Sequence, residues 1–176
     1  YRPAPAPVNG DTVDRVAKAI DAAKKPAILI RGTALKAEGL EAAGRVAAKT
    51  GARILCDTFA PRIQRGAGRV AVERIPYFAE QIVEFLEGTD LLVLVGAKPP
   101  VSFFAYPGKP SWCSPEETVI TYLAHAHEDG RMALEALAEA CGADATAPTY
   151  TDLKLPDLPT GALDSMTAGA VIAHYL

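Results

Sequence analysis

The chain has 176 residues, of which 49% are hydrophobic and 22% are charged, and its 18 basic and 21 acidic residues give a net charge of −3. This composition is typical of a soluble globular domain, and the small negative charge excludes a general electrostatic attraction to nucleic acid or to an anionic membrane. No apolar stretch approaches the roughly 20 residues needed to span a bilayer. We therefore expect a cytoplasmic protein.

The first half of the chain predicts two helices that alternate with two strands. Residues 1–10 are rich in proline and predict an extended linker. Asp11 is a suitable N-cap for a helix to about Lys24, and the apolar run 27–30 after Pro26 predicts a strand. Apolar residues at helical spacing predict a second helix over 38–50, which Gly51 ends before a second strand at 53–56.

The second half contains two long irregular stretches. Prolines, glycines and four arginines (Arg62, Arg65, Arg69 and Arg74) interrupt the pattern from Thr58 to Pro76, which predicts a surface loop. A helix over 78–87 and a strand over 91–95 follow, and a second irregular stretch runs from Lys98 to Pro115. Residues 119–123 predict another strand, and 132–141 predict a helix whose N-terminus is favoured by Glu128 and Asp129.

The predicted strands are continuous Ile, Leu and Val runs without polar alternation. Such runs are typical of strands covered on both faces, and the helices between them supply the crossovers of a parallel sheet. The sequence therefore predicts an α/β domain over residues 11–147, a three-layer α/β/α Rossmann-like parallel sheet. Residues 148–176 combine a proline-spaced stretch with a helical start near Met166, which predicts a linker and the beginning of a next domain.

Candidate ligand-binding residues follow three of the strands. Ligands of open parallel sheets bind beyond the carboxyl ends of the strands, where small residues allow close approach to the backbone. Two explanations remain open for these positions: they contact a nucleotide, or a strand-to-helix turn simply needs glycine. The candidate cofactor-binding residues are Gly32, Thr33, Ala34, Asp57, Gly96, Ala97 and Lys98.

Other motifs are weaker. Residues 66–71 match G-x-G-x-x-A but do not follow a strand directly, so we do not expect a dinucleotide fingerprint there. The arginines around it could bind an anion, contact a neighbouring domain or simply be solvated. His125 and His127 would share one side of a continued strand, and Glu128 and Asp129 could complete a metal site, although an exposed helix start explains them as well.

No complete active site is present in the sequence. It contains no P-loop and no Ser/His/Asp or Cys/His arrangement with supporting context, so we predict no catalytic residue and no metal ligand. Cys56, Cys113 and Cys141 are odd in number and widely spaced, which predicts free thiols. The aromatic stretch 103–110, with Trp112 nearby, is typical of interfaces and ligand pockets, and burial against a partner domain or on the domain's own sheet both remain open.

Segments 26–35, 47–58 and 89–97 together resemble the central domain of the acetolactate synthase and benzoylformate decarboxylase group of thiamine diphosphate enzymes. Phe104-Ala-Tyr-Pro-Gly-Lys-Pro110 is similar to a subgroup of acetolactate synthase large subunit-like proteins. The resemblance covers about residues 11–142. It implies a DHS-like NAD/FAD-binding fold in a chain of three domains, assembled as a homodimer or homotetramer.

The resemblance also implies the chemistry. The family decarboxylates 2-oxo acids, and some members join the product to a second carbonyl compound. Thiamine diphosphate and Mg²⁺ are held by the other two domains, which carry an activating glutamate and a Gly-Asp-Gly motif that this sequence lacks, so the isolated domain should be inactive. Some members bind FAD in the central domain, but Lys98 stands where they have arginine, which argues against FAD here. The alternatives are a nucleotide-binding module for FAD, ADP or NAD with a redox or regulatory role, and a structural interaction domain.

Overall fold

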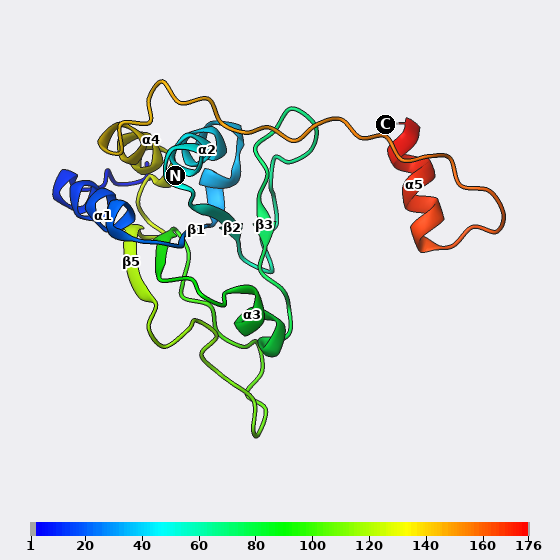
Figure 1. The fold of residues 1–176 in the computed structure, drawn as a ribbon, viewed down its shortest axis with the longest axis horizontal. Coiled ribbons are helices and arrows are strands. Elements are labelled where there is room, and N and C mark those ends of the chain that lie inside the picture. The colour runs from blue at the N-terminus through cyan, green and yellow to red at the C-terminus, as the bar shows by residue number, and fades with distance from the viewer. Residues whose placement is uncertain (1–2, 176) are drawn as a thin grey trace.

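The centre of the molecule is a five-stranded parallel sheet with strand order β3-β2-β1-β4-β5 (Figure 1). The computed structural model describes residues 3–175. Ile28 of β1 pairs with Ile54 of β2 and Val93 of β4, so the chain leaves β1 toward one edge and later returns beside it. The strands are β1 (Pro26–Ile30), β2 (Arg53–Cys56), β3 (Glu73–Arg74), β4 (Leu91–Val95) and β5 (Val119–Ala124).

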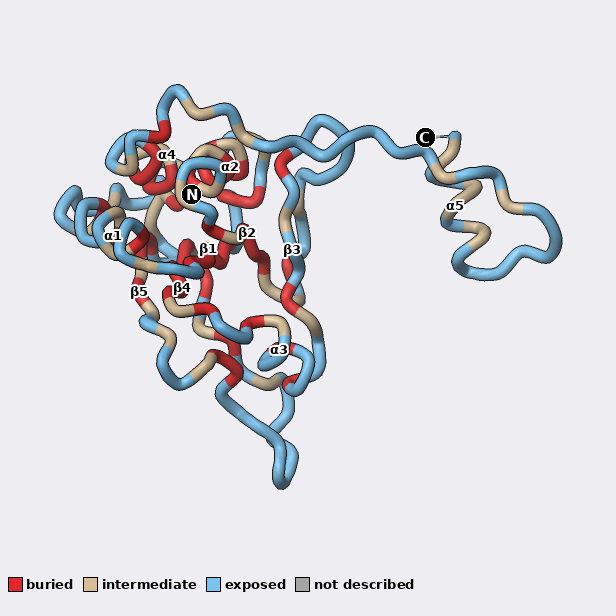
Figure 2. The backbone as a smooth tube through the Cα atoms, in the orientation of Figure 1, coloured by how far each residue is buried: buried red, intermediate tan, exposed pale blue. Residues whose placement is uncertain are grey.

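Three helices cover one face of this sheet: α1 (Gly10–Ala22), α2 (Ala37–Thr50) and α4 (Gly130–Ala140) (Figure 1). Their apolar residues recur every three or four positions, so each helix presents one stripe to the sheet. The result is a large aliphatic core, which Figure 2 shows as the buried segments between helices and strands. Its fully buried members include Val16, Ile20, Leu40, Val46, Leu134 and Leu137.

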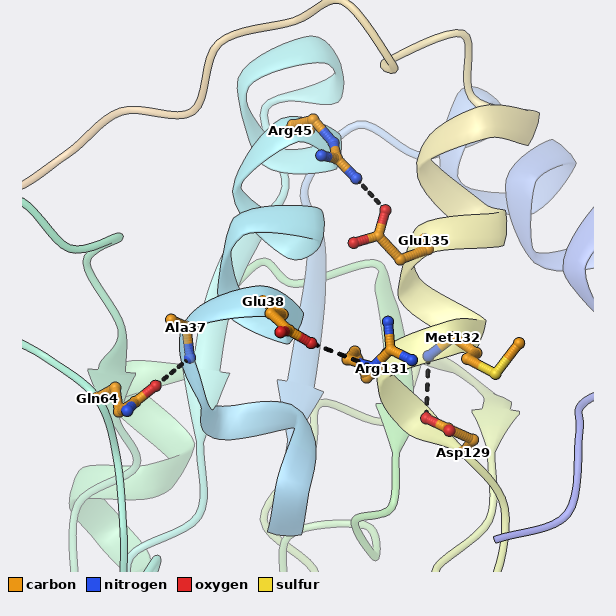
Figure 3. A network of polar contacts seen from close by, with 8 residues as sticks. All are labelled: Ala37, Glu38, Arg45, Gln64, Asp129, Arg131, Met132 and Glu135. Atoms are coloured by element: carbon orange, nitrogen blue, oxygen red, sulfur yellow. Dashed lines mark hydrogen bonds and ion pairs between the residues drawn. The ribbon is translucent and has the colours of Figure 1, made fainter. Parts of the chain in front are cut away.

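Ion pairs on the outer side join α2 to α4 (Figure 3). Arg45 pairs with Glu135, and Arg131 Nε lies 3.5 Å from Glu38 Oε2. At the start of α2, the Ala37 N–H donates to the side chain of Gln64, which ties the loop after β2 to the same helix.

The opposite face is covered more thinly. Of the helices within residues 3–175, only α3 (Ala79–Phe85) lies on it, and Ile82 and Leu86 pack there against strand residues that include Leu29, Leu55 and Leu94. The sheet therefore has helical cover on both faces, and the predicted three-layer α/β fold class is confirmed.

Three local predictions are wrong. The N-cap of α1 is Asn9 rather than Asp11, because Asn9 Oδ1 accepts from the Asp11 N–H at 2.9 Å and the helix begins at Gly10. The predicted loop from Thr58 to Pro76 contains β3, which pairs in parallel with β2 at its end. The predicted helix over 78–87 is shorter: α3 ends at Phe85, because Leu86, whose N–H still donates to Ile82 O at 3.0 Å, has left the helical conformation with φ −95° and ψ 2°.

The two ends of the chain differ in their contacts. Ala6 forms a parallel bridge with Glu128, so the proline-rich segment lies against the start of α4. After Ala143 the chain follows an extended path to α5 (Ser165–Tyr175), which has no buried residue and stands apart from the sheet (Figures 1 and 2). The predicted domain boundaries at 10/11 and 147/148 stay predictions. Within residues 3–175, no helix combines the length and the apolar character that crossing a membrane requires.

Candidate functional site

A cleft of about 810 Å³ lies at the carboxyl edge of the sheet, between the ends of β1 and β4; we term it the β1/β4 cleft. These two strands stay paired to their ends, because Arg31 N donates to Val95 O at 2.9 Å, and the end of β4 is joined to β5 by a bond of 2.8 Å from Gly96 N to Ala124 O. The structure thus brings six of the seven predicted site residues to one place. They are Gly32, Thr33, Ala34, Gly96, Ala97 and Lys98.

The glycines of this cleft have a conformational reason that involves no ligand. Gly32 and Gly96 have φ values of +74° and +65°, which residues with a Cβ rarely adopt. A Cβ on Gly96 would also lie 3.2 Å from Arg31 O. In α2, a Cβ on Gly39 would lie 2.4 Å from Ala34 O, so this glycine lets the helix pack directly on the turn after β1. These glycines are thus explained by the turns without a ligand, and nucleotide contact at the predicted site residues stays a prediction.

The seventh predicted residue, Asp57, lines a neighbouring cleft of about 330 Å³, which we term the β1/β2 cleft. Asp57 Oδ2 accepts from Arg31 Nε at 2.9 Å, with the side chains 25% and 49% exposed. Its other oxygen, Oδ1, is buried and has no hydrogen-bond partner among residues 3–175. Arg31 and Lys98 line both clefts, so positive charge lies between them, and only Arg31 is ion-paired within the described part of the chain.

The two histidines lie close together, although β5 ends at Ala124 and the continued strand that would place them on one side does not form. The rings of His125 and His127 are nearly parallel, at 5° with centroids 6.0 Å apart, and Tyr122 stacks on His125 at 4.5 Å. The acidic neighbours serve the backbone: Glu128 Oε2 accepts from the His125 N–H at 2.6 Å, and Asp129 caps α4 through the Met132 N–H (Figure 3). Across residues 3–175, no group of three His, Cys, Asp or Glu side chains is arranged to hold a metal ion.

Sequence reasoning missed several residues of the β1/β4 cleft. Tyr122 lies inside a predicted strand, where no pattern marks it as a site residue. Arg31 directly precedes the predicted glycine turn, and this position could have marked it as a residue of the cleft. Pro3 and Pro5 reach the cleft because the Ala6 N–H donates to His127 O at 3.1 Å and Ala6 O accepts from the Asp129 N–H at 2.8 Å. No local pattern signals such a contact between the two ends of the domain.

Side-chain contacts hold the end of the arginine-rich stretch. Arg74 donates to Thr58 O at 2.8 Å, and Arg53 Nη2 pairs with Glu73 Oε2 at 2.9 Å. The G-x-G-x-x-A segment pairs with the chain near Thr151, through a Gly68 N–H bond to Thr151 O of 2.9 Å. It lies at no strand-to-helix turn, in agreement with our rejection of a fingerprint there.

The cysteines are free thiols, as predicted. Cys56 and Cys113 are buried and Cys141 is partly buried, and desolvation raises the pKa of each thiol above its ordinary value. All three therefore remain protonated at neutral pH, where a thiol is a poor nucleophile.

Comparisons with solved structures identify proteins that share this fold. The fold matches a thiamine diphosphate-dependent 4-hydroxybenzoylformate decarboxylase of Rhodococcus jostii RHA1 with a TM-score of 0.63 and 18% identity, over 92% of this chain and 33% of that one. It matches the benzoylformate decarboxylase of Polynucleobacter necessarius with a TM-score of 0.63 and 17% identity, over 95% of this chain and 34% of that one. The fold is therefore one that thiamine diphosphate-dependent enzymes contain within a longer chain.

A relative in sequence makes the resemblance more specific. The chain is 43% identical over 175 residues to a Mycobacterium tuberculosis protein named as an acetolactate synthase large subunit, IlvX. The match covers 98% of this chain and 33% of the relative, so the chain spans about one third of the relative's length. No protein-family model matches the chain. The predicted resemblance to the acetolactate synthase-like group of thiamine diphosphate enzymes is thus confirmed.

Proposed function

We propose that this chain is the non-catalytic central domain of a thiamine diphosphate-dependent, acetolactate synthase-like enzyme that acts on 2-oxo acids. The observation that carries the proposal is the 43% identity over nearly the whole chain to only one third of such a protein. The shared fold with two decarboxylases of aromatic 2-oxo acids supports it.

The contents of the two clefts support a non-catalytic role. Neither cleft joins a nucleophile to a general base, and burial raises the pKa of all three thiols, so they stay protonated at neutral pH. The sequence has no Gly-Asp-Gly motif for Mg²⁺ and diphosphate. Thiamine diphosphate, which would accept the electrons released with carbon dioxide, and Mg²⁺ would therefore be bound outside this domain. The chain would contribute scaffold and contacts to the other domains of a cytoplasmic homo-oligomer.

The domain boundaries belong to the same proposal. Residues 1–10 would link this domain to a preceding one, and residues 148–176 would lead into the diphosphate-binding domain. Helix α5 supports the second boundary: it is apolar, yet Met166 and Tyr175 are 80% and 74% exposed, as expected for a helix whose packing partners belong to another unit.

The proposal is tested by measuring carbon dioxide release from pyruvate and benzoylformate. We expect release by the longer polypeptide, dependent on thiamine diphosphate and Mg²⁺, and none by the 176-residue chain under the same conditions. Thiamine diphosphate-dependent turnover by the 176-residue chain alone would contradict the non-catalytic role. A longer polypeptide that neither binds thiamine diphosphate nor decarboxylates would contradict the enzyme assignment.

A nucleotide-binding module with a redox or regulatory role is the second candidate. It is favoured by the β1/β4 cleft, where six predicted residues and the cations Arg31 and Lys98 converge. Titration of the chain with FAD, ADP and NAD tests it. Saturable binding that Lys98→Ala weakens, while Lys154→Ala at an exposed distant site does not, would support the module. Absence of binding by all three nucleotides would leave the scaffold role.

A further inference from the structure

Two short backbone pairings attach the ends of the chain to opposite edges of the sheet. At the entry, Ala6 forms a parallel bridge with Glu128, beside the turn that follows the edge strand β5. At the exit, Tyr150 forms an antiparallel bridge with Val70, shortly before the other edge strand, β3. We term these pairings the entry clamp and the exit clamp. The chain therefore enters and leaves the domain at two defined points.

Two hydrogen bonds close the exit clamp. The Gly68 N–H donates to Thr151 O at 2.9 Å, and the Thr151 N–H donates to Arg69 O at 2.8 Å. Residues 148–151, which the sequence assigns to the linker, are thus paired with the central domain. The G-x-G-x-x-A segment, which is no dinucleotide fingerprint, has a different role here: its backbone pairs with the departing chain.

A glycine inside α2 makes room for the exit clamp. Gly44 is buried in the middle of this helix, where glycine is unfavourable because its backbone loses the most conformational freedom on folding. A Cβ at this position would lie 2.8 Å from Pro148 Cβ and 2.9 Å from Val70 Cγ2. A side chain there would hold off the segment that crosses α2 on its way from α4 to the β3 edge (Figure 1).

The entry clamp leaves little slack before the first helix. The Ala6 N–H donates to His127 O at 3.1 Å, and Ala6 O accepts from the Asp129 N–H at 2.8 Å. Residues 7–9 alone separate this clamp from α1, which begins at Gly10. A segment held by two bonds so close to a packed helix has little freedom to change its direction.

We propose that the two clamps are positioning devices, which hold the neighbouring domains of the longer polypeptide at fixed points on this one. The inference rests on the proposed function, in which thiamine diphosphate is bound outside this domain. Reacting groups that come from different domains must meet in one geometry, so a loosened attachment lowers turnover. Ala6 and Thr151 act through the neighbouring domains and are positioning residues.

The length of free chain sets the size of the effect at the exit. With the clamp closed, the stretch 152–164 separates the last paired residue from α5. An open clamp would also free residues 144–151, back to the buried Ala143. The longer tether lowers the effective concentration of the following domain about twofold, and the fixed exit direction is lost as well.

A proline substitution in the longer polypeptide tests the exit clamp. Thr151→Pro removes the N–H that donates to Arg69 O and no buried side chain, so the Gly68 amide should exchange its hydrogen at least about tenfold faster. We expect kcat for carbon dioxide release from pyruvate or benzoylformate to fall about twofold or more at saturating thiamine diphosphate. KM should stay unchanged, because no substrate contact is removed.

Two further variants separate the clamp from other effects of the substitution. Thr151→Ser keeps the N–H and should keep the wild-type kcat. Lys154→Pro is the matched control, since the Lys154 N–H forms no hydrogen bond within residues 3–175. It should leave both hydrogen exchange and kcat unchanged.

Ala6→Pro tests the entry clamp in the same way, with Ala4→Pro as its control. We expect faster exchange at the Asp129 amide, whose acceptor is Ala6 O, and a similar fall in kcat. Faster exchange with unchanged kcat would overturn the positioning role of that clamp and leave the proposed function standing. Exchange no faster than in the control variant would overturn the clamp itself. A wild-type polypeptide that does not decarboxylate would overturn the proposed function, and the positioning role with it.

Discussion

The two faces of the sheet are built differently. The face under α1, α2 and α4 is sealed by three regular helices and an aliphatic core. The other face carries the seven-residue α3 and irregular loops whose aromatic rings stay half exposed. The first face thus holds the domain together, whereas the second leaves surface for contacts beyond it. Both candidate clefts open at the edge where these faces meet the strand ends.

The largest expected effect is on the free energy of unfolding, and it distinguishes the core under α1, α2 and α4 from the core under α3. Leu134→Ala in α4 removes a fully buried side chain from the sealed face and should cost about 2–5 kcal/mol of unfolding free energy. Leu86→Ala behind α3 should fall near the lower limit, because the loops around it can relax into the cavity. Urea denaturation measures both, with exposed Leu163→Ala as the control. Equal costs for Leu134→Ala and Leu86→Ala would show that the second face is as rigid as the first.

Close packing of α2 on the turn after β1 gives the next effect. Gly39→Ala places a Cβ against the Ala34 carbonyl, a backbone atom that cannot move aside, and should cost about 1–3 kcal/mol. Gly10→Ala is the matched control, since a Cβ there has no atom within 4 Å. Thermal melts compare the two. A Gly39→Ala protein as stable as Gly10→Ala would contradict the close contact.

A substitution of Arg53 tests which contacts stabilise the sheet face that α3 covers. Its guanidinium forms two bonds to Glu73 in β3, donates to Phe85 O at 2.8 Å and lies 4.3 Å from the Phe85 ring centre. Lysine keeps the charge but not the planar fork, so Arg53→Lys should cost about 1 kcal/mol in urea denaturation. Lys49→Arg, an exchange of the same kind in the last turn of α2, is the control. Unchanged stability in Arg53→Lys would mean that β3 and α3 need no such clamp.

The smallest effect is the pH dependence contributed by Asp90, which joins the end of α1 to the sheet. Its carboxylate accepts from the backbone N–H groups of Lys24 at 2.6 Å and Lys25 at 2.9 Å, and these bonds lower its pKa below the ordinary value. The stabilisation is therefore present above the ordinary pKa and is lost as the pH falls through the lowered one. Asp90→Asn should melt below wild type at pH 7, and the difference should shrink toward pH 2–3, about the range below the ordinary pKa of aspartate. A constant difference across this range would exclude the ionised carboxylate as the cause.

The comparison of faces also explains what the sequence could predict. Strands 27–30, 53–56 and 91–95 were predictable because burial on both faces imposes continuous apolar runs, and β4 has the predicted bounds. β3 could not be predicted, since its two residues are exposed and only pairing with β2 defines it. The convergence of strand ends places six site residues together, whereas Asp57 lies apart because it follows β2, which is separated from β4 by β1. The sequence could not predict whether the aromatic stretch 103–110 is buried, because its exposure depends on tertiary contacts.

The most direct test of the central claim is the intact mass and cofactor content of the native gene product. Our account predicts a polypeptide about three times the length of this chain, consistent with the match to one third of the relative, that carries bound thiamine diphosphate. A mature product limited to these 176 residues and free of thiamine diphosphate would contradict the assignment to an acetolactate synthase-like enzyme.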